Sequence, residues 1–65
     1  MRVIVNGQEK LVAEGASVQQ ILDEMKLSPD RVAVEVNRRL LRTARYGEPL
    51  KDGDQVEIVT FVGGG

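Results

Sequence analysis

Cysteine, histidine and tryptophan are absent from this 65-residue sequence, and tyrosine and phenylalanine occur once each. Without cysteine there is no disulfide, no thiolate metal site and no thiol nucleophile, a composition that a reducing cytoplasm permits. The only serines, Ser17 and Ser28, have no histidine to activate them. A general base would have to be a buried carboxylate or lysine, and so small a domain offers little burial. We therefore expect no enzyme activity, no metal site and no cofactor of its own.

Long apolar runs and an excess of one charge are also missing. The formal net charge is -1, with acids and bases mixed along the chain, so no overall field attracts nucleic acid or membrane. Only Tyr46 and Phe61 could stack on bases. The chain turns polar after residues 3–5, too early for a signal peptide or a spanning helix. We expect a cytoplasmic protein with neither nucleic acid nor membrane among its partners.

Turn and capping signals in the first half predict a hairpin followed by one helix. Residues 2–5 are β-rich and precede Asn6-Gly7, a strong hairpin signal because both positions of a type I′ turn need positive φ. A second strand is expected at about residues 9–13. Ser17 and Gln20 fit a capping box, and the helix should run over residues 18–26 with one apolar stripe facing a core.

The second half reads as strands separated by turns. Residues 32–37 alternate with period two, residues 37–39 turn the chain, and a short strand is possible at 40–42. A loop over 43–50 and a turn at 52–54 precede a last strand over 55–62. These elements predict a two-layer α+β domain. Its expected core comprises Ile4, Val18, Ile21, Leu22, Met25, Val34, Val36, Leu50, Val56 and Ile58.

Three glycines, Gly63, Gly64 and Gly65, end the sequence. Glycine has maximal backbone freedom and no side chain to pack, so we expect a flexible tail beyond the last strand. Such a tail is slim enough to enter a narrow channel and deliver the Gly65 carboxylate to an active site on another protein. The alternative is a frayed terminus or a linker. The apolar strand leading into the tail, and the lack of reactive groups elsewhere, favour the first interpretation.

The whole sequence resembles the ubiquitin-like, β-grasp family of sulfur carriers, and within it the carriers of thiamine thiazole biosynthesis. The most specific segments are residues 50–58, Leu-Lys-Asp-Gly-Asp-Gln-Val-Glu-Ile, and residues 61–65, Phe-Val-Gly-Gly-Gly. The opening residues 3–7, the helix over 18–25 and the strand over 32–37 support them. The resemblance implies a β-grasp domain over residues 1–62, with a mixed sheet of four to five strands packed on one main helix, and a tail over residues 63–65.

The resemblance also implies a mechanism. A partner of the ubiquitin-activating type would use ATP and Mg²⁺ to adenylate the Gly65 carboxylate. A persulfide on a partner cysteine, supplied by a cysteine desulfurase, would then displace AMP and leave a thiocarboxylate. Thiazole synthase would take that sulfur. The chain ends in three glycines where the common pattern has two, which fits the mechanism only if Gly65 is the true end.

Several alternatives stay open at this stage. Val59 and Phe61, with Val62, Gly63 and Gly64, would contact the activating partner, unless the loop over 43–50 covers the two large side chains. Four arginines, Arg38, Arg39, Arg42 and Arg45, would form either a solvated turn or a contact with an acidic partner. The small subunit of molybdopterin synthase has the same fold and chemistry, and a ubiquitin-like modifier or interaction module is a further possibility.

Overall fold

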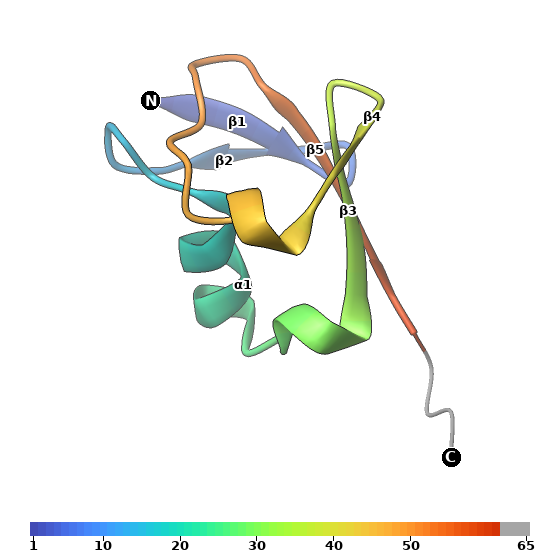
Figure 1. Cartoon of the computed structure of the whole chain (residues 1–65). Coiled ribbons are helices and arrows are strands. Elements are labelled where there is room, and N and C mark those ends of the chain that lie inside the picture. Colours follow the sequence, from blue (N-terminus) through green and yellow to red (C-terminus); the bar gives the residue numbers. More distant parts are fainter. Residues whose placement is uncertain (62–65) are drawn as a thin grey trace.

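The computed structural model describes residues 1–61 as a five-stranded sheet with one α-helix packed on one face (Figure 1). The α-helix and strands, in chain order, are β1 (Arg2–Val5), β2 (Gln8–Leu11), α1 (Val18–Met25), β3 (Val32–Val36), β4 (Arg39–Leu41) and β5 (Gln55–Thr60). Two short 3₁₀ helices, η1 (Pro29–Arg31) and η2 (Thr43–Arg45), lie in the connections. No helix in residues 1–61 has the length and apolar character needed to cross a membrane.

The strand order across the sheet is β2-β1-β5-β3-β4. β5 lies at the centre, parallel to β1 and antiparallel to β3, while the β1–β2 and β3–β4 pairs are antiparallel. The sheet is therefore mixed, and the predicted α+β class with one main helix is confirmed. The parallel pairing of β1 with β5 places the first and last strands of the described chain side by side in the middle of the sheet.

The local signals in the sequence are present in the structure. Asn6 and Gly7 have φ of 50° and 81°, as a type I′ turn requires. The backbone N–H of Gln20 donates to Ser17 Oγ at 3.3 Å, and the backbone N–H of Ser17 donates to the Gln20 side-chain Oε1 at 3.0 Å. The capping box is therefore confirmed. α1 ends at Met25, and the next residue, Lys26, caps it with a left-handed φ of 60°.

Strand boundaries differ from the predictions by one or two residues. β2 starts and ends earlier than expected because the two-residue turn leads directly into pairing of Val5 with Gln8. β4 begins at Arg39, since Asn37 and Arg38 both have positive φ and complete the turn by themselves. β5 is described as a strand up to Thr60.

The core lies between α1 and the sheet. Buried side chains confirm seven of the ten predicted core positions, and Val36 is half-buried against the edge of the core. The seven are Val18, Ile21, Leu22, Val34, Leu50, Val56 and Ile58. Core members that sequence reasoning missed include Val3, Val5, Val32 and Tyr46.

Two predicted core positions are wrong. Ile4 is half-buried, because pairing of Val5 with Val56 puts Val3 and Val5 on the helix side of β1 and turns Ile4 to the other side. Met25 is the last residue of α1 and is 41% exposed, so the apolar stripe of the helix is buried only in its earlier turns.

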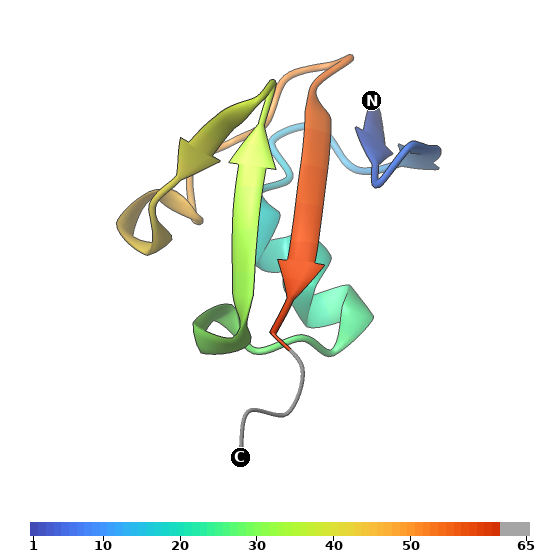
Figure 2. The same cartoon turned by 90° about the vertical axis from the view of Figure 1, so that its right-hand side faces the viewer.

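The opposite side of the sheet has no covering layer in the described part of the chain; we call it the open face. Figure 2 looks toward it, with β3 and β5 side by side in front and α1 behind. Period-two alternation and the strand register define its members. They are Arg2, Ile4, Glu9, Leu11, Ala33, Glu35, Leu40, Gln55, Glu57 and Val59.

Candidate functional site: the open face at the end of β5

The predicted reactive group and most of its tail, Val62, Gly63, Gly64 and Gly65, lie outside the residues that the structure describes. The predictions of a flexible tail and of a reactive Gly65 carboxylate therefore stay predictions. The structure does describe the chain before this tail, with β5 ending at Thr60 and Phe61 following it. The surface around the end of β5 is the part of the candidate site that can be described.

Two large apolar side chains are exposed at this end of β5. Val59 lies on the open face opposite Ala33 of β3 and is 56% exposed. Phe61, two residues further on, is 58% exposed. The backbone N–H of Phe61 donates to the Arg31 carbonyl at 2.8 Å, so β3 and its preceding turn still hold the chain at this point. The structure thus presents two of the predicted partner-binding residues, Val59 and Phe61, to solvent.

The loop over 43–50 does not cover these side chains, so that alternative is wrong. The loop packs on the helix side of the sheet, where Tyr46 and Leu50 are buried in the core. The Gln19 N–H donates to the Tyr46 carbonyl at 2.9 Å, and the Leu50 N–H donates to the Ala16 carbonyl at 2.7 Å. These bonds tie the loop to the start of α1, away from the open face (Figure 1).

Asn6 fixes the strand that carries this surface. Its side-chain Nδ2 donates to the Ile58 carbonyl at 3.2 Å, and its Oδ1 accepts from the Ile58 N–H at 2.7 Å. The Asn6 backbone N–H also donates to the Val56 carbonyl at 2.9 Å. Sequence reasoning took Asn6 only as a turn residue, and nothing in the sequence marks this second role, because it depends on β5 lying beside the turn.

The four arginines differ in their contacts: Arg45 has an acidic partner within the described residues, and the other three are exposed. Arg45 Nε and Nη2 donate to the Glu48 carboxylate at 3.0 to 3.1 Å. This hydrogen bonding lowers the pKa of Glu48 and raises the pKa of Arg45. Arg38, Arg39 and Arg42 are exposed along the β3–β4 turn and the edge strand β4. Both predicted alternatives for this cluster, a solvated turn and a contact with an acidic partner, stay predictions.

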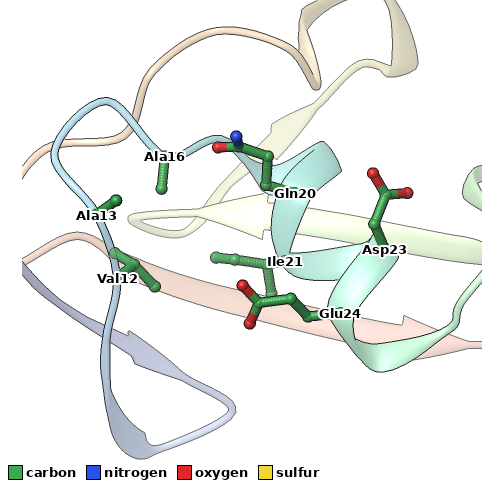
Figure 3. Close-up of a pocket in the computed structure, with 7 residues that line it drawn as sticks. All are labelled: Val12, Ala13, Ala16, Gln20, Ile21, Asp23 and Glu24. Carbon is green, nitrogen blue, oxygen red and sulfur yellow. The ribbon is translucent and has the colours of Figure 1, made fainter.

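A shallow hollow of about 250 Å³ lies between α1 and the segment after β2 (Figure 3). Gln20, Asp23 and Glu24 line it together with apolar side chains. Each of these polar groups already has a local partner: Gln20 belongs to the capping box, Asp23 accepts from Gln19 Nε2 at 2.9 Å, and Glu24 pairs with Lys10 at 3.3 Å. The hollow therefore has no free acid or base arranged for chemistry, which agrees with the surface role predicted for Asp23 and Glu24.

Comparisons with known proteins agree with this architecture. Residues 2–65 match the ThiS family. The sulfur carrier protein ThiS of Bacillus subtilis is 38% identical over 63 residues, covering 94% of this chain and 96% of the relative. A thiazole synthase of Paramagnetospirillum magneticum is 35% identical over 66 residues, covering all of this chain but 20% of the relative. The chain thus spans about one fifth of the length of the first relatives it matches.

Solved structures give the same result for the fold. The crystal structure of the thiamine biosynthesis protein ThiS from Geobacter metallireducens superposes with a TM-score of 0.80, at 36% identity and with full coverage of both chains. A ubiquitin-like protein from Caldiarchaeum subterraneum, 23% identical with a TM-score of 0.51 over 97% of this chain and 96% of its own, shares the fold. The expected ubiquitin-like β-grasp fold is confirmed. On the family match over residues 2–65 and these relatives, the chain belongs to the ThiS family.

Proposed function

We propose that this protein is a sulfur carrier of thiamine biosynthesis and that it works through the carboxylate of Gly65. Membership of the ThiS family supports the carrier role. The observation that carries the proposal within this chain is a pair of exposed apolar side chains, Val59 on β5 and Phe61 just after it, which precede the glycines. In such a domain, the exposed apolar groups can bind a partner, and the adjacent glycine tail can enter the partner's active site as its substrate.

The proposed chemistry takes place in a partner's active site. A carboxylate is a poor electrophile until one oxygen becomes a leaving group, so an adenylating enzyme of the ubiquitin-activating type would join Gly65 to AMP and release pyrophosphate from ATP. ATP and Mg²⁺ belong to that enzyme. The terminal sulfur of a partner persulfide, which a cysteine desulfurase would generate, then displaces AMP, and a second thiol releases the Gly65 thiocarboxylate. In this scheme the chain is a protein cosubstrate and performs no catalysis.

Thiazole synthase is the proposed acceptor of the sulfur. Two relatives that carry the name thiazole synthase contain a segment similar to the whole of this chain within a polypeptide about five times as long. A carrier-like segment in the same polypeptide as a thiazole synthase supports a direct transfer between the two.

Intact mass spectrometry tests the proposal. After incubation with the matching adenylating enzyme, ATP and a sulfur source, the wild-type chain should gain the mass of one oxygen-to-sulfur exchange. Addition of one alanine after Gly65, or the substitution Gly64→Val, should abolish this gain, because the first moves the carboxylate and the second widens the tail. Circular dichroism should give the same folded spectrum for all three proteins.

Gly47→Ala is the matched control. A Cβ at Gly47 meets no atom within 4 Å, and its φ lies outside the left-handed region, so this variant should gain sulfur as wild type does. Sulfur uptake by the alanine-extended protein at the wild-type rate would refute the Gly65 carboxylate as the carrier site. Stable conjugates to other proteins, in place of the sulfur gain, would identify a modifier.

A further inference from the structure

Asn6 and Gly7, at the tip of the β1–β2 hairpin, are the only Asn-Gly pair in the sequence. Both residues are exposed, and a Cβ added at Gly7 would meet no atom within 4 Å, so solvent surrounds the turn. Asparagine is a thermolabile residue because its side-chain amide can be attacked by the next backbone nitrogen. Glycine hinders this attack least, since it has no side chain beside that nitrogen. The turn therefore presents a chemically labile amide to water.

Deamidation of Asn6 needs no reagent other than water. The Gly7 backbone nitrogen loses its proton to solvent and bonds to Asn6 Cγ, while the bond from Cγ to Nδ2 breaks and ammonia leaves. Water then opens the succinimide ring. Opening at Cγ gives aspartate, and opening at the backbone carbonyl carbon gives isoaspartate, whose main chain runs through the former side chain. Either product exchanges a neutral amide for a carboxylate, with no oxidation or reduction.

Two hydrogen bonds hold this amide in the folded chain. Asn6 Nδ2 donates to the Ile58 carbonyl at 3.2 Å, and Asn6 Oδ1 accepts from the Ile58 N–H at 2.7 Å. Ring closure turns Cγ toward the Gly7 nitrogen and expels Nδ2, so the amide has to leave β5 first. The contact with Ile58 therefore opposes the reaction that the Asn-Gly pair favours.

We propose that Asn6 is a site of spontaneous deamidation and that its hydrogen bonds to Ile58 set the rate by holding the amide on β5. Both products lose the donor to the Ile58 carbonyl, and in aspartate a carboxylate oxygen takes its place near that acceptor. Isoaspartate also adds one main-chain atom to a two-residue turn whose register pairs Val5 with Gln8. The modification therefore releases the part of β5 that lies beyond the end of β1.

Asn37 is the matched internal control. It is the only other asparagine, is exposed, and has a φ of 53°, close to the 50° of Asn6. Its side chain is also bonded at β5: Oδ1 accepts from the Gln55 N–H at 3.0 Å, and Nδ2 donates to Asp54 Oδ1 at 3.0 Å. The next residue is Arg38, whose side chain hinders attack by its backbone nitrogen. The two sites thus share conformation and bonding and differ in the residue that follows.

Timed incubation of the whole chain in mildly alkaline buffer, with and without enough urea to unfold it, tests the proposal. Intact mass follows the amide-to-acid exchange, peptide mapping assigns it to Asn6 or Asn37, and isoaspartyl methyltransferase detects isoaspartate. In urea, Asn6 should be largely converted before Asn37 reacts measurably. Without urea, Asn6 should react about tenfold more slowly than in urea, the factor that two hydrogen bonds of ordinary net strength supply.

Hydrogen exchange of the purified isoaspartate product supplies a second readout. The Ile58 N–H should exchange about tenfold faster than in wild type, because the longer main chain moves its acceptor away. The Leu50 N–H, which donates to the Ala16 carbonyl at 2.7 Å on the helix side, should keep its wild-type rate. An unchanged Ile58 rate would overturn the release of β5.

Three results of the incubation would overturn the proposal. Equal Asn6 rates with and without urea would show that Ile58 does not delay the reaction. Equal rates for Asn6 and Asn37 in urea would remove the preference for the Asn-Gly pair. Asn6 that stays intact without urea, long after a tenfold slower reaction would be complete, would show that the folded chain is not modified. The incubation contains no partner enzyme, so none of these results bears on the proposed sulfur transfer.

Discussion

Asn6 has two roles, one in the local β1–β2 turn and one in holding the distant strand β5. Its φ of 50° makes it the first residue of the β1–β2 turn, and its side-chain amide donates to and accepts from the backbone of Ile58. β1 ends at Val5, so the amide replaces the backbone groups that a longer β1 would have offered to β5. One side chain therefore extends the central strand pairing where the backbone turns away.

Asn6→Gly separates these roles. Glycine tolerates positive φ and preserves the turn, but it removes both hydrogen bonds to Ile58. We expect a loss of about 1–2 kcal/mol in the free energy of unfolding, measured by urea denaturation. Asn6→Asp, which keeps an acceptor and loses the donor, should also be less stable than wild type. Equal urea midpoints for Asn6→Gly and wild type would exclude a contribution from these bonds.

At the scale of single elements, α1 shows how a helix of eight residues is held. Its capping box satisfies backbone N–H groups at the start, and a left-handed Lys26 ends it. Ile21 and Leu22 are at most 1% exposed and pack on the sheet. So short a helix depends on this packing, because helix propensity alone does not stabilise eight residues in water.

Leu22→Ala and Met25→Ala should therefore differ strongly, although both residues belong to the same apolar stripe. Truncation of the fully buried Leu22 leaves a cavity and should cost about 2–5 kcal/mol. Met25 is already 41% exposed, and its truncation should cost less than about 1 kcal/mol. Urea midpoints compare the two variants, and similar losses would contradict the burial pattern of α1.

At the scale of the whole molecule, one side of the sheet is buried and the other exposes apolar side chains. The helix side holds the core and the loop over 43–50, while the open face exposes Leu11, Leu40 and Val59. Only Val59 of these three is on β5, and Phe61 follows it. The proposed docking surface therefore lies where apolar side chains approach the glycine tail.

Phe61→Ser and Leu11→Ser test this asymmetry as a matched pair. Leu11 is 82% exposed on the edge strand β2, while Phe61 is 58% exposed beside the tail. Phe61→Ser should raise the KM of the adenylating enzyme for the carrier by about tenfold, because an apolar docking contact is lost. Leu11→Ser should leave KM unchanged, and both urea midpoints should stay near wild type. Equal KM values for Phe61→Ser and wild type would remove Phe61 from the docking surface.

The sequence by itself determined those features that depend on neighbours along the chain. The Asn6-Gly7 turn needs positive φ at two successive residues, the Ser17 and Gln20 capping box spans three residues, and β5 shows its alternation within one strand. Family resemblance added the mixed sheet and the β-grasp fold. Each of these predictions was confirmed, with boundaries shifted by one or two residues.

Only the tertiary structure decided which face each strand presents and what lies beside it. Val3, Ile4 and Val5 are all apolar, so the sequence does not show which of them face the core. Pairing of Val5 with Val56 places Val3 and Val5 on the helix side. The burial of Tyr46 and the meeting of Glu35 with Glu57 likewise depend on segments more than twenty residues apart. Register between distant strands is set by the face that α1 covers, and no local pattern contains that information.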